Sequence, residues 1–292
     1  KLILYAPICD FRISESLGND VDRYALSLLS MFDETTVVRF APTTPWASLK
    51  GKHAPNLSRE DILLGLQGDP DDDRDFYFFE EFKDVDALPK TMLPATPVKN
   101  QGAYNSCTGF AVTGAFETLR LMRTGEVLDL SEMFTYYKAR QKASLQGQDK
   151  GAFLRDAVKS ARNDGLALEE YCVYALNSVY EVPDWRAHFA ARFLRVKNYY
   201  RCAGVDDVRR ALTLKMPVVF GMRVPQSYFV YKCGVLSGAG QKLAGGHAQA
   251  IVGHDDSLRA FRVRNSWGSG WGYGGYAWLS YAAFENLLMD AW

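Results

Sequence analysis

The order of secondary-structure patterns along the chain is the strongest constraint on its fold. Before residue 215, segments with helical spacing and small or apolar residues recur at 106–122, 131–140, 153–163 and 206–214. After residue 217 the pattern changes to short β-rich segments punctuated by glycine, at 218–224, 228–236, 248–252, 261–264 and 275–279. Helices followed by strands are typical of an α+β fold, in which a helical lobe packs on a sheet lobe.

The composition is that of an ordinary globular protein. The 292 residues are 48% hydrophobic and 23% charged, which excludes a disordered chain, a collagen and a coiled coil. No uncharged apolar stretch approaches the roughly 18 residues that a membrane span needs. There is no Lys/Arg-rich run and no zinc-finger spacing, so a nucleic-acid partner is not expected. We expect a monomer without a membrane span, a metal or a cofactor.

Charge is divided unevenly along the chain. Residues 1–90 carry 10 basic and 17 acidic side chains, whereas residues 91–292 carry 24 and 17, so the two parts have net charges of −7 and +7. We therefore predict an acidic N-terminal extension, 1–90, and a basic domain, 91–292, joined through the proline-rich stretch 88–97. Chance sorting of charge along a single domain is the alternative.

The cysteines are too few and too widely spaced for a dense disulfide framework or a Cys-x-x-Cys metal site, and at least one is free because their number is odd: Cys9, Cys107, Cys172, Cys202 and Cys233. Cys107 begins the helical segment 106–122, where the helix dipole favours a thiolate and lowers the thiol pKa. Its backbone amide and the side-chain amide of Gln101 can face the same developing oxyanion. Taken alone, however, a buried cysteine is more often an inert packing residue.

His247 is the candidate base among the four histidines. His53 lies in a proline-rich stretch, His188 in an Arg-rich amphipathic helix and His254 just before a turn, so these three are expected at the surface. His247 instead follows two glycines and begins an apolar strand. Farther along, Asn265 can orient an imidazole through a hydrogen bond, and Trp267 can keep water from it. A Gly/Trp loop alone is commonly structural, so the combination with a thiol is what indicates nucleophilic catalysis.

These motifs together resemble the papain-like cysteine peptidases. Residues 97–102 with Ser106-Cys107, then Gly246-His247-Ala248, then 265–272 with Gly275-Tyr276 occur in that family's order. Residues 91–292 also have about the length of its catalytic domain. The resemblance implies a papain-like fold of two lobes, one helical and one an antiparallel β-sheet, with a cleft between them and an N-terminal extension in front.

The resemblance also implies a role for each matching position. Cys107 would be the nucleophile, and it would form a thiolate–imidazolium pair with His247. Asn265 would orient the imidazole, Trp267 would shield their hydrogen bond, and Gln101 would supply the oxyanion-hole amide. On a peptide or protein substrate, the thiolate would form a thioester while the imidazolium protonates the leaving amine, and the imidazole would then activate water.

Four further positions fall where the family binds its substrate. Gly151 matches a glycine that hydrogen-bonds the substrate backbone. Gly221, Met222 and Gly246 fall near the main specificity pocket, and the two glycines among them predict a roomy apolar pocket. The sequence leaves open whether the enzyme is an endopeptidase or an exopeptidase.

Some positions depart from the family's pattern. Thr108 replaces the usual tryptophan, Tyr104 stands where a disulfide cysteine is usual, and Asn105 replaces a common glycine. The Cys-Thr pair resembles a bacterial-type subset, as does the acidic stretch that ends at 74–77. We expect a protein that is secreted or delivered to a host, although the missing disulfide also makes folding in a reducing compartment feasible.

The acidic extension lacks the interspersed helical motif of the family's usual prosegment, so its role is inferred from physics. An acidic segment tethered to a basic domain has a high effective concentration, and the aromatic run 76–79 offers apolar anchoring. We hypothesise that residues 1–90 contact the catalytic domain and cover part of its cleft, as in a zymogen. If the attraction is electrostatic, salt and acid should loosen it. The alternative is a fixed structural extension that adds strands to the sheet lobe.

The motifs leave two further functions open. An acyltransferase or transpeptidase would use the same thioester with an amine acceptor. A pseudopeptidase would keep the fold only as a binding module, but a binder has no need to retain Cys107, His247, Asn265 and Gln101 together.

Overall fold

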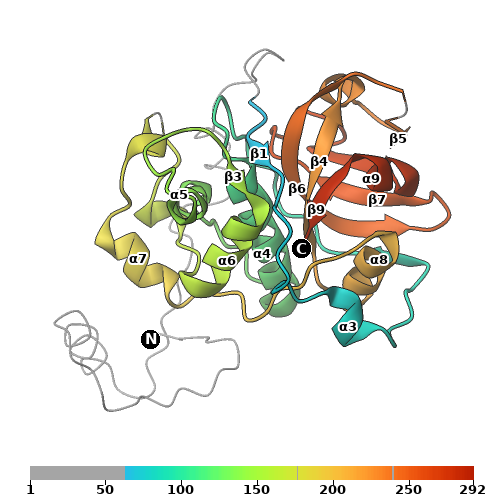
Figure 1. The fold of residues 1–292 in the computed structure, drawn as a ribbon, viewed down its shortest axis with the longest axis horizontal. Helices are drawn as coiled ribbons and strands as arrows, with labels where there is room; N and C mark the ends of the chain where they lie inside the picture. Colours follow the sequence, from blue (N-terminus) through green and yellow to red (C-terminus); the bar gives the residue numbers. More distant parts are fainter. Residues whose placement is uncertain (1–62, 176, 239) are drawn as a thin grey trace. The chain divides into compact units, whose positions relative to one another are not determined.

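Most helices and most strands occupy separate lobes in the part of the chain that the computed structural model describes, which is residues 63–175, 177–238 and 240–292 (Figure 1). All of these residues belong to one compact unit. The expectations for Cys9 and His53 fall outside the described residues. The α+β class predicted from the order of sequence patterns is confirmed.

The helical lobe is built around α4. Its helices are α4 (Cys107–Thr124), α5 (Glu132–Lys142), α6 (Leu154–Asn163) and α7 (Trp185–Ala191). Helix α4 contacts α5 and α6 as well as strand β6 of the other lobe, so its first half is buried throughout and carries mostly small residues. A short strand, β3 (Ala152–Phe153), precedes α6, and the 3₁₀ helices Glu169–Tyr171 and Ser178–Tyr180 lead to α7. No helix in the described ranges is long and apolar enough to cross a membrane.

The other lobe is a sheet with the strand order β5-β8-β7-β6-β4-β9, and β2 also pairs with β6. All neighbours are antiparallel except β5 and β8. The strands are β2 (Lys90–Met92), β4 (Val218–Pro225), β5 (Val235–Leu236), β6 (Leu243–Asp255), β7 (Ala260–Arg264), β8 (Tyr276–Ser280) and β9 (Leu288–Ala291). Helices α8 (Val205–Thr213) and α9 (Tyr281–Leu287) contact this sheet, and α3 (Phe78–Phe82) contacts α8.

The segment 228–236 differs from the strand that its pattern predicts. It contains most of a 3₁₀ helix, Gln226–Val230, and only the two-residue strand β5. The Tyr228 ring is fully buried beside Trp271, and the Trp271 indole nitrogen donates to the Tyr228 carbonyl oxygen at 2.9 Å. The aromatic residues here serve to pack around a tryptophan, which gives them a β-like composition without a strand ladder.

Three other expectations change around β6. The strand begins at Leu243, because Gly245 and Gly246 continue it instead of ending it. His254, expected at the surface, is fully buried in this strand, with Nδ1 3.2 Å from the Tyr281 hydroxyl oxygen. The stretch 88–97, expected as a linker, contains β2, which pairs with β6. The division at residue 90 stays a prediction.

A buried cluster of charged side chains links the segment before Gln101 to both lobes. The Lys99 ammonium lies 3.0 Å from Glu117 on α4, 2.7 Å from Glu132 on α5 and 2.7 Å from Asp129. On the sheet side, the Arg264 guanidinium lies 3.6 Å from Glu117. Burial alone would lower the pKa of Lys99, but the surrounding carboxylates outweigh it and raise that pKa. The buried ammonium of Lys99 is therefore compensated inside the protein.

Replacing Lys99 with methionine should strongly destabilise the fold. Lys99→Met leaves buried carboxylates without their cation, so the free energy of unfolding should fall by about 3–5 kcal/mol. Urea denaturation followed by tryptophan fluorescence measures this change. Arg74→Met, which removes an exposed ion pair with Asp72, is the control and should leave the free energy of unfolding nearly unchanged. Equal effects of the two substitutions would contradict this prediction.

Candidate active site

The Cys107 thiol lies at the start of α4 and is fully buried. The backbone amides of Ala248, next to His247, and of Gly65 lie close to its sulfur. Burial raises the pKa of this thiol to about 11, although the amides lower it in part. The shift is opposite to the one that the helix dipole predicts from sequence, because loss of water outweighs the dipole in this covered site.

The His247 imidazole is fixed from two sides. Its Nε2 lies 2.8 Å from Asn265 Oδ1, and the Trp267 ring stacks on it with centroids 4.8 Å apart. Phe229 in turn stacks on the Trp267 ring, with ring centroids 5.3 Å apart. The remaining nitrogen, Nδ1, has no hydrogen-bond partner among the described residues. Burial lowers the pKa of His247 to about 4, so the imidazole and the Cys107 thiol are both neutral in this state.

The Gln101 side chain is held so that its amide nitrogen contacts the N-terminal extension. Its Oε1 accepts a hydrogen bond from the Ser266 hydroxyl at 2.7 Å, and its backbone carbonyl accepts one from Tyr174. Its Nε2 donates to the Leu63 carbonyl oxygen at 3.2 Å and to that of Tyr104 at 2.9 Å. Because Ser266 directly follows Asn265, one loop fixes both the imidazole and this amide.

A segment of the N-terminal extension runs between the two lobes over these groups; we call residues 63–69 the strap. Its strand β1 (Leu66–Gln67) pairs in parallel with β3 of the helical lobe. On the other side, Gly65 forms a bridge with Gly246 of β6. Figure 1 shows β1 at the junction of the lobes, beside α4 and β6.

The strap lies against three of the four predicted substrate-binding residues. A Cβ on Gly151, whose φ is +80°, would collide with the Gly65 carbonyl oxygen. A Cβ on Gly246 would lie 2.7 Å from the Leu66 carbonyl oxygen, and one on Gly221 would collide with the Leu66 side chain. Met222 lies on the other face of β4, opposite His247 in the ladder, because neighbouring strand residues point to opposite faces.

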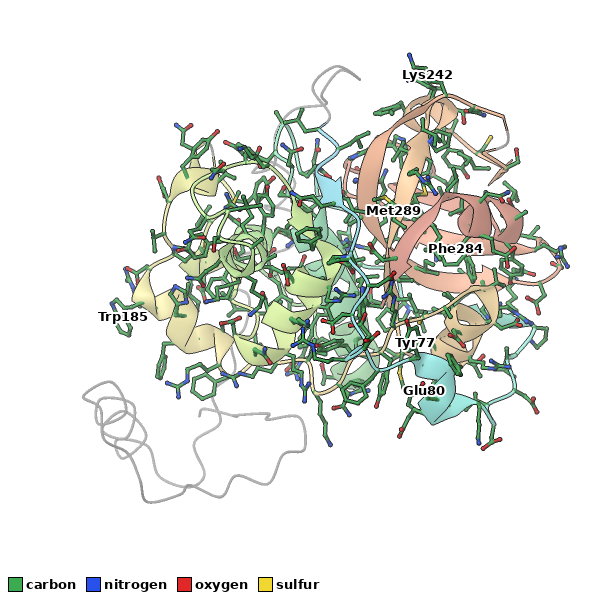
Figure 2. The ribbon with its side chains drawn as sticks, viewed as in Figure 1. Tyr77, Glu80, Trp185, Lys242, Phe284 and Met289 are labelled. Atoms are coloured by element: carbon green, nitrogen blue, oxygen red, sulfur yellow. The ribbon has the colours of Figure 1, made fainter. Side chains whose placement is uncertain are left out.

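Several residues that the sequence reasoning did not single out contribute to this site. Ser266 and Tyr174 hold Gln101, and Phe229 backs Trp267. Met289 and Asp290 of β9 come close to Gly246 and Gly221, and Figure 2 shows Met289 near the junction of the lobes. The sequence gives one hint of the strap, which is a glycine between two leucines just before the acidic run.

Together these groups define a thiol-dependent site. A buried thiol lies at a helix start, an imidazole is held by an amide and shielded by an indole, and a second amide faces the cleft. The sequence-family model of the papain family cysteine proteases matches residues 83–287 of this chain. The chain therefore belongs to the papain family, and it is a cysteine peptidase.

Individual relatives agree with this assignment. An uncharacterized peptidase C1-like protein of Acanthamoeba polyphaga mimivirus is 30% identical over 219 residues, which cover 69% of this chain and 70% of that protein. Pro-cathepsin H of Mus musculus is 30% identical over 190 residues, which cover 62% of this chain and 55% of that protein. The chain thus spans about half the length of most relatives of this kind.

Solved structures confirm the papain-like fold predicted from the sequence motifs. Xylellain, a cysteine protease from Xylella fastidiosa, has a TM-score of 0.69 and 27% identity, and the match covers 78% of this chain and 94% of that one. The proform of the ragweed pollen cysteine protease Amb a 11 has a TM-score of 0.58 at 24% identity, which bears on the fold alone. The relatives include viral, animal and plant proteins, so the bacterial-type subset stays a prediction.

Proposed function

We propose that this peptidase cuts peptide bonds through a thioester on Cys107 and that the strap restrains it by occupying the cleft. One observation carries the proposal. The Leu63 carbonyl oxygen accepts from the Gln101 amide at 3.2 Å, and the Gly65 amide lies close enough to Cys107 to lower the pKa of its thiol. A peptide backbone therefore fits between the thiol and the amide, where a substrate carbonyl would be polarised.

The proposed reaction begins once the strap has left the thiol. Water then reaches Cys107 and His247, so the penalty that keeps both neutral falls and the thiol proton moves to Nδ1 of the imidazole. The thiolate attacks the substrate carbonyl carbon, and the Gln101 and Cys107 amides bind the oxyanion. The imidazolium gives its proton to the leaving amine, which leaves a thioester. The imidazole then takes a proton from water, the hydroxide attacks the thioester, and the acid is released with the thiol restored.

The strap has anchors that can hold it in the cleft. The Asp69 carboxylate accepts from the Arg155 amide at 3.1 Å and from the Trp292 indole nitrogen at 2.9 Å. Just beyond the strap, Asp75 pairs with Arg155 at 2.5 Å and with Arg201 at 3.0 Å. The Asp75 ion pairs join the extension to two arginines of the domain, and they support the proposed restraint.

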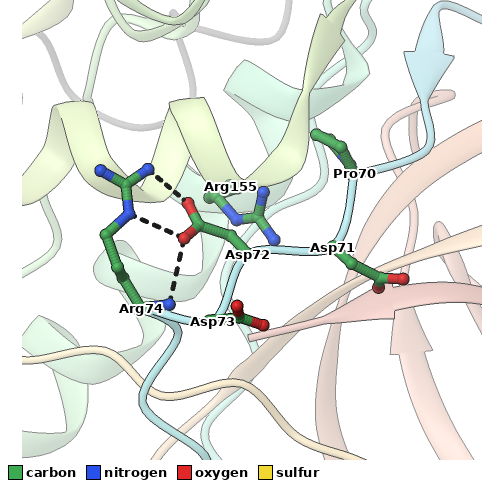
Figure 3. A pocket seen from close by; sticks show the side chains of 6 residues that line it. All are labelled: Pro70, Asp71, Asp72, Asp73, Arg74 and Arg155. Carbon is green, nitrogen blue, oxygen red and sulfur yellow. Dashed lines mark hydrogen bonds and ion pairs between the residues drawn. The ribbon is translucent and has the colours of Figure 1, made fainter.

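The turn between these anchors is exposed and internally paired. Figure 3 shows the Arg74 guanidinium directed at Asp72, with hydrogen bonds of 2.8 Å, while Arg155 extends from α6 nearby. The Arg74 guanidinium is therefore paired within the turn itself. We infer that the arginines of the catalytic domain, rather than Arg74, hold the extension in place.

Peptide hydrolysis should depend on Cys107 alone among the thiols. In Cys107→Ala, cleavage of a fluorogenic peptide should fall by at least about a thousandfold, because the nucleophile is gone. Labelling by an epoxide thiol inhibitor, followed by mass spectrometry, should be lost as well. Cys233→Ala, which removes an exposed thiol, is the control and should leave both unchanged.

Three outcomes would contradict this function. Hydrolysis that persists in Cys107→Ala would exclude a thioester mechanism. A new amide, formed in place of the acid when an amine acceptor is added, would indicate the acyltransferase or transpeptidase instead. Binding of peptides without any turnover or labelling would indicate the pseudopeptidase.

Removing the Leu66 side chain, which is the main side-chain contact of the strap, should activate the intact chain. Leu66 is 7% exposed, so Leu66→Gly should destabilise the covered state, in which the strap lies over the thiol, by about 2 kcal/mol or more. The value of kcat/KM for a small peptide should then rise by roughly tenfold or more. Steady-state hydrolysis by the full chain measures this. Leu258→Gly, at a half-exposed leucine far from the strap in sequence, is the control. Equal activity of the Leu66→Gly and unaltered chains would support a fixed structural extension.

The restraint should be stronger in acid than above neutrality. Burial raises the pKa of Asp69 and raises that of Asp290 to about 7, and the Arg155 and Arg201 guanidinium groups offset this only in part. Raised values mean that the covered state gains stability when these carboxyls are protonated and loses it as pH rises through about 7. This sign is opposite to the loosening by acid that the charge division predicts.

The measurement is a ratio of rates at each pH. Dividing the rate of Leu66→Gly by that of the unaltered chain cancels the ionisation of the thiol itself. The ratio should be largest near pH 5 and should decline above about pH 7. In the background of Asp290→Asn, which cannot ionise, the decline should be smaller. A ratio that rises with pH would contradict the proposal that ionisation of Asp69 and Asp290 weakens the restraint.

A further inference from the structure

Asp149 joins two loops of the helical lobe that both contact the strap. Its carboxylate accepts from the Asn105 backbone amide, with Oδ1 at 3.1 Å and Oδ2 at 3.2 Å. In return, the Asn105 side-chain amide donates to the Asp149 carbonyl oxygen at 2.9 Å. Asn105 lies two residues before Cys107, so this reciprocal pair holds the start of α4 against the loop that leads to β3.

The same carboxylate reaches the edge of β3 through Tyr136. The Tyr136 hydroxyl donates to Asp149 Oδ1 at 2.7 Å and accepts from the Gly151 amide at 2.9 Å. Burial and the adjacent Asp149 carboxylate raise the pKa of Tyr136, so the hydroxyl keeps its proton and remains a donor. The Gly151 amide is thereby committed to Tyr136. The next amide, of Ala152, donates instead to the Gly65 carbonyl oxygen of the strap at 3.1 Å.

Arg140 fixes Tyr136 in turn. This arginine of α5 is fully buried, and its guanidinium carbon lies 4.2 Å from the centre of the Tyr136 ring. It donates to the carbonyl oxygens of Gln148 and Val179, each at 2.8 Å. Because Gln148 directly precedes Asp149, one arginine holds both the ring and the loop that the carboxylate joins. The link made by Asp149 is therefore anchored on α5.

The two linked loops enclose a gap that holds one peptide backbone. Gly65 of the strap passes through it, because a Cβ on Gly65 would collide with Asn105, and one on Gly151 would collide with the Gly65 carbonyl oxygen. The Gly65 amide also lies close to the Cys107 sulfur, so the gap opens on the thiol. Asp149 contacts Asn105 on one side and, by way of the tyrosine hydroxyl, Gly151 on the other. The hydrogen bonds of its carboxylate therefore set the width of the gap.

We infer that Asp149 is a positioning residue of the peptidase, which fixes the gap through which a substrate backbone reaches the thiol. It acts through Asn105 and Tyr136 and does not itself touch the substrate. The inference rests on the proposed function, in which a substrate takes the place of the strap. The described cysteines are all free, so no disulfide among them holds these loops together. Hydrogen bonds to a carboxylate do so instead, and bonds to a charged acceptor are stronger than those between neutral groups.

The consequence is a difference between reagents that need the gap and reagents that do not. A peptide must be held in a near-attack geometry, and a displacement of about 1 Å can slow its reaction about a hundredfold. Iodoacetamide is small enough to reach the thiol without a backbone in the gap. Loosening the walls should therefore slow the reaction of Cys107 with peptides, while its reaction with iodoacetamide is retained.

The test measures both reactions on the same protein. The full chain with Leu66→Gly, with and without Asp149→Ala, is alkylated at Cys107 by a blocked leucyl-glycyl chloromethyl ketone and, separately, by iodoacetamide. Mass spectrometry follows each reaction. Dividing the first rate by the second cancels the fraction of protein that is folded and uncovered. We expect Asp149→Ala to lower this ratio by at least about tenfold.

Two further variants separate positioning from a general loss of structure. Tyr136→Phe keeps the buried ring and removes only the hydroxyl, so it should lower the ratio as well. Its effect should be smaller when Asp149→Ala is already present, because the two groups act through one link. Asp164→Ala removes a partly buried carboxylate of the same lobe, which pairs with Lys138, and should leave the ratio unchanged.

Three results would overturn the inference: a ratio that Asp149→Ala does not change, an equal fall in Asp164→Ala, or additive effects of Asp149→Ala and Tyr136→Phe. Hydrolysis of a fluorogenic peptide by the Leu66→Gly chain distinguishes this failure from failure of the proposed function. If the ratio falls as expected but no peptide is hydrolysed, the peptidase function fails, and the role of Asp149 in positioning a peptide at the thiol stands. If neither reagent labels Cys107, both proposals fail.

Discussion

The buried ion pairs of Lys99 are the interaction on which the rest of the site depends. They join the segment that leads to Gln101 to helices α4 and α5, because Glu117 and Glu132 both contact the same ammonium. Through Glu117 the cluster reaches Arg264, which directly precedes Asn265. The helix that carries Cys107 and the loop that orients His247 are therefore tied to one set of compensated charges, and a single unpaired member would cost several kcal/mol. Apolar packing alone would place these groups with less precision.

Much of the fold and of the candidate site could be predicted because the signals are local. The helix that begins at Cys107 has its own periodicity, and Asn265 and Trp267 are two residues apart, so their joint position near a histidine follows from a short motif. Contacts between distant segments could not be predicted in this way. Nothing near Leu66 in the sequence indicates that it meets Gly221 and lies beside Asp290, because those contacts depend on how two strands and the extension come together. The prediction of a lowered thiol pKa for Cys107 was wrong for the same reason, since burial outweighs a local helix dipole.

Under the proposed function, the strap acts on the site in two ways at once. It occupies the Gln101 amide, a donor that a substrate would use, and it places the Gly65 amide close to the Cys107 sulfur. It also excludes water, and without water neither the thiolate nor the imidazolium is stable, as the opposite pKa shifts of Cys107 and His247 indicate. Displacing the strap therefore frees the binding groups and restores the ionised pair in a single step, so no separate activation of the nucleophile is needed.

The charge division of the chain has a more specific meaning at the strap than simple attraction. Asp75 does face two arginines, but Asp69 lies next to another carboxyl group, Asp290, and both are raised in pKa by burial. A pair of this kind favours the covered state only while it holds a proton. When the proton leaves, two neighbouring carboxylates repel each other and the strap is held less strongly. Under the proposed function, release of the strap then depends on one local ionisation rather than on a general attraction between an acidic extension and a basic domain.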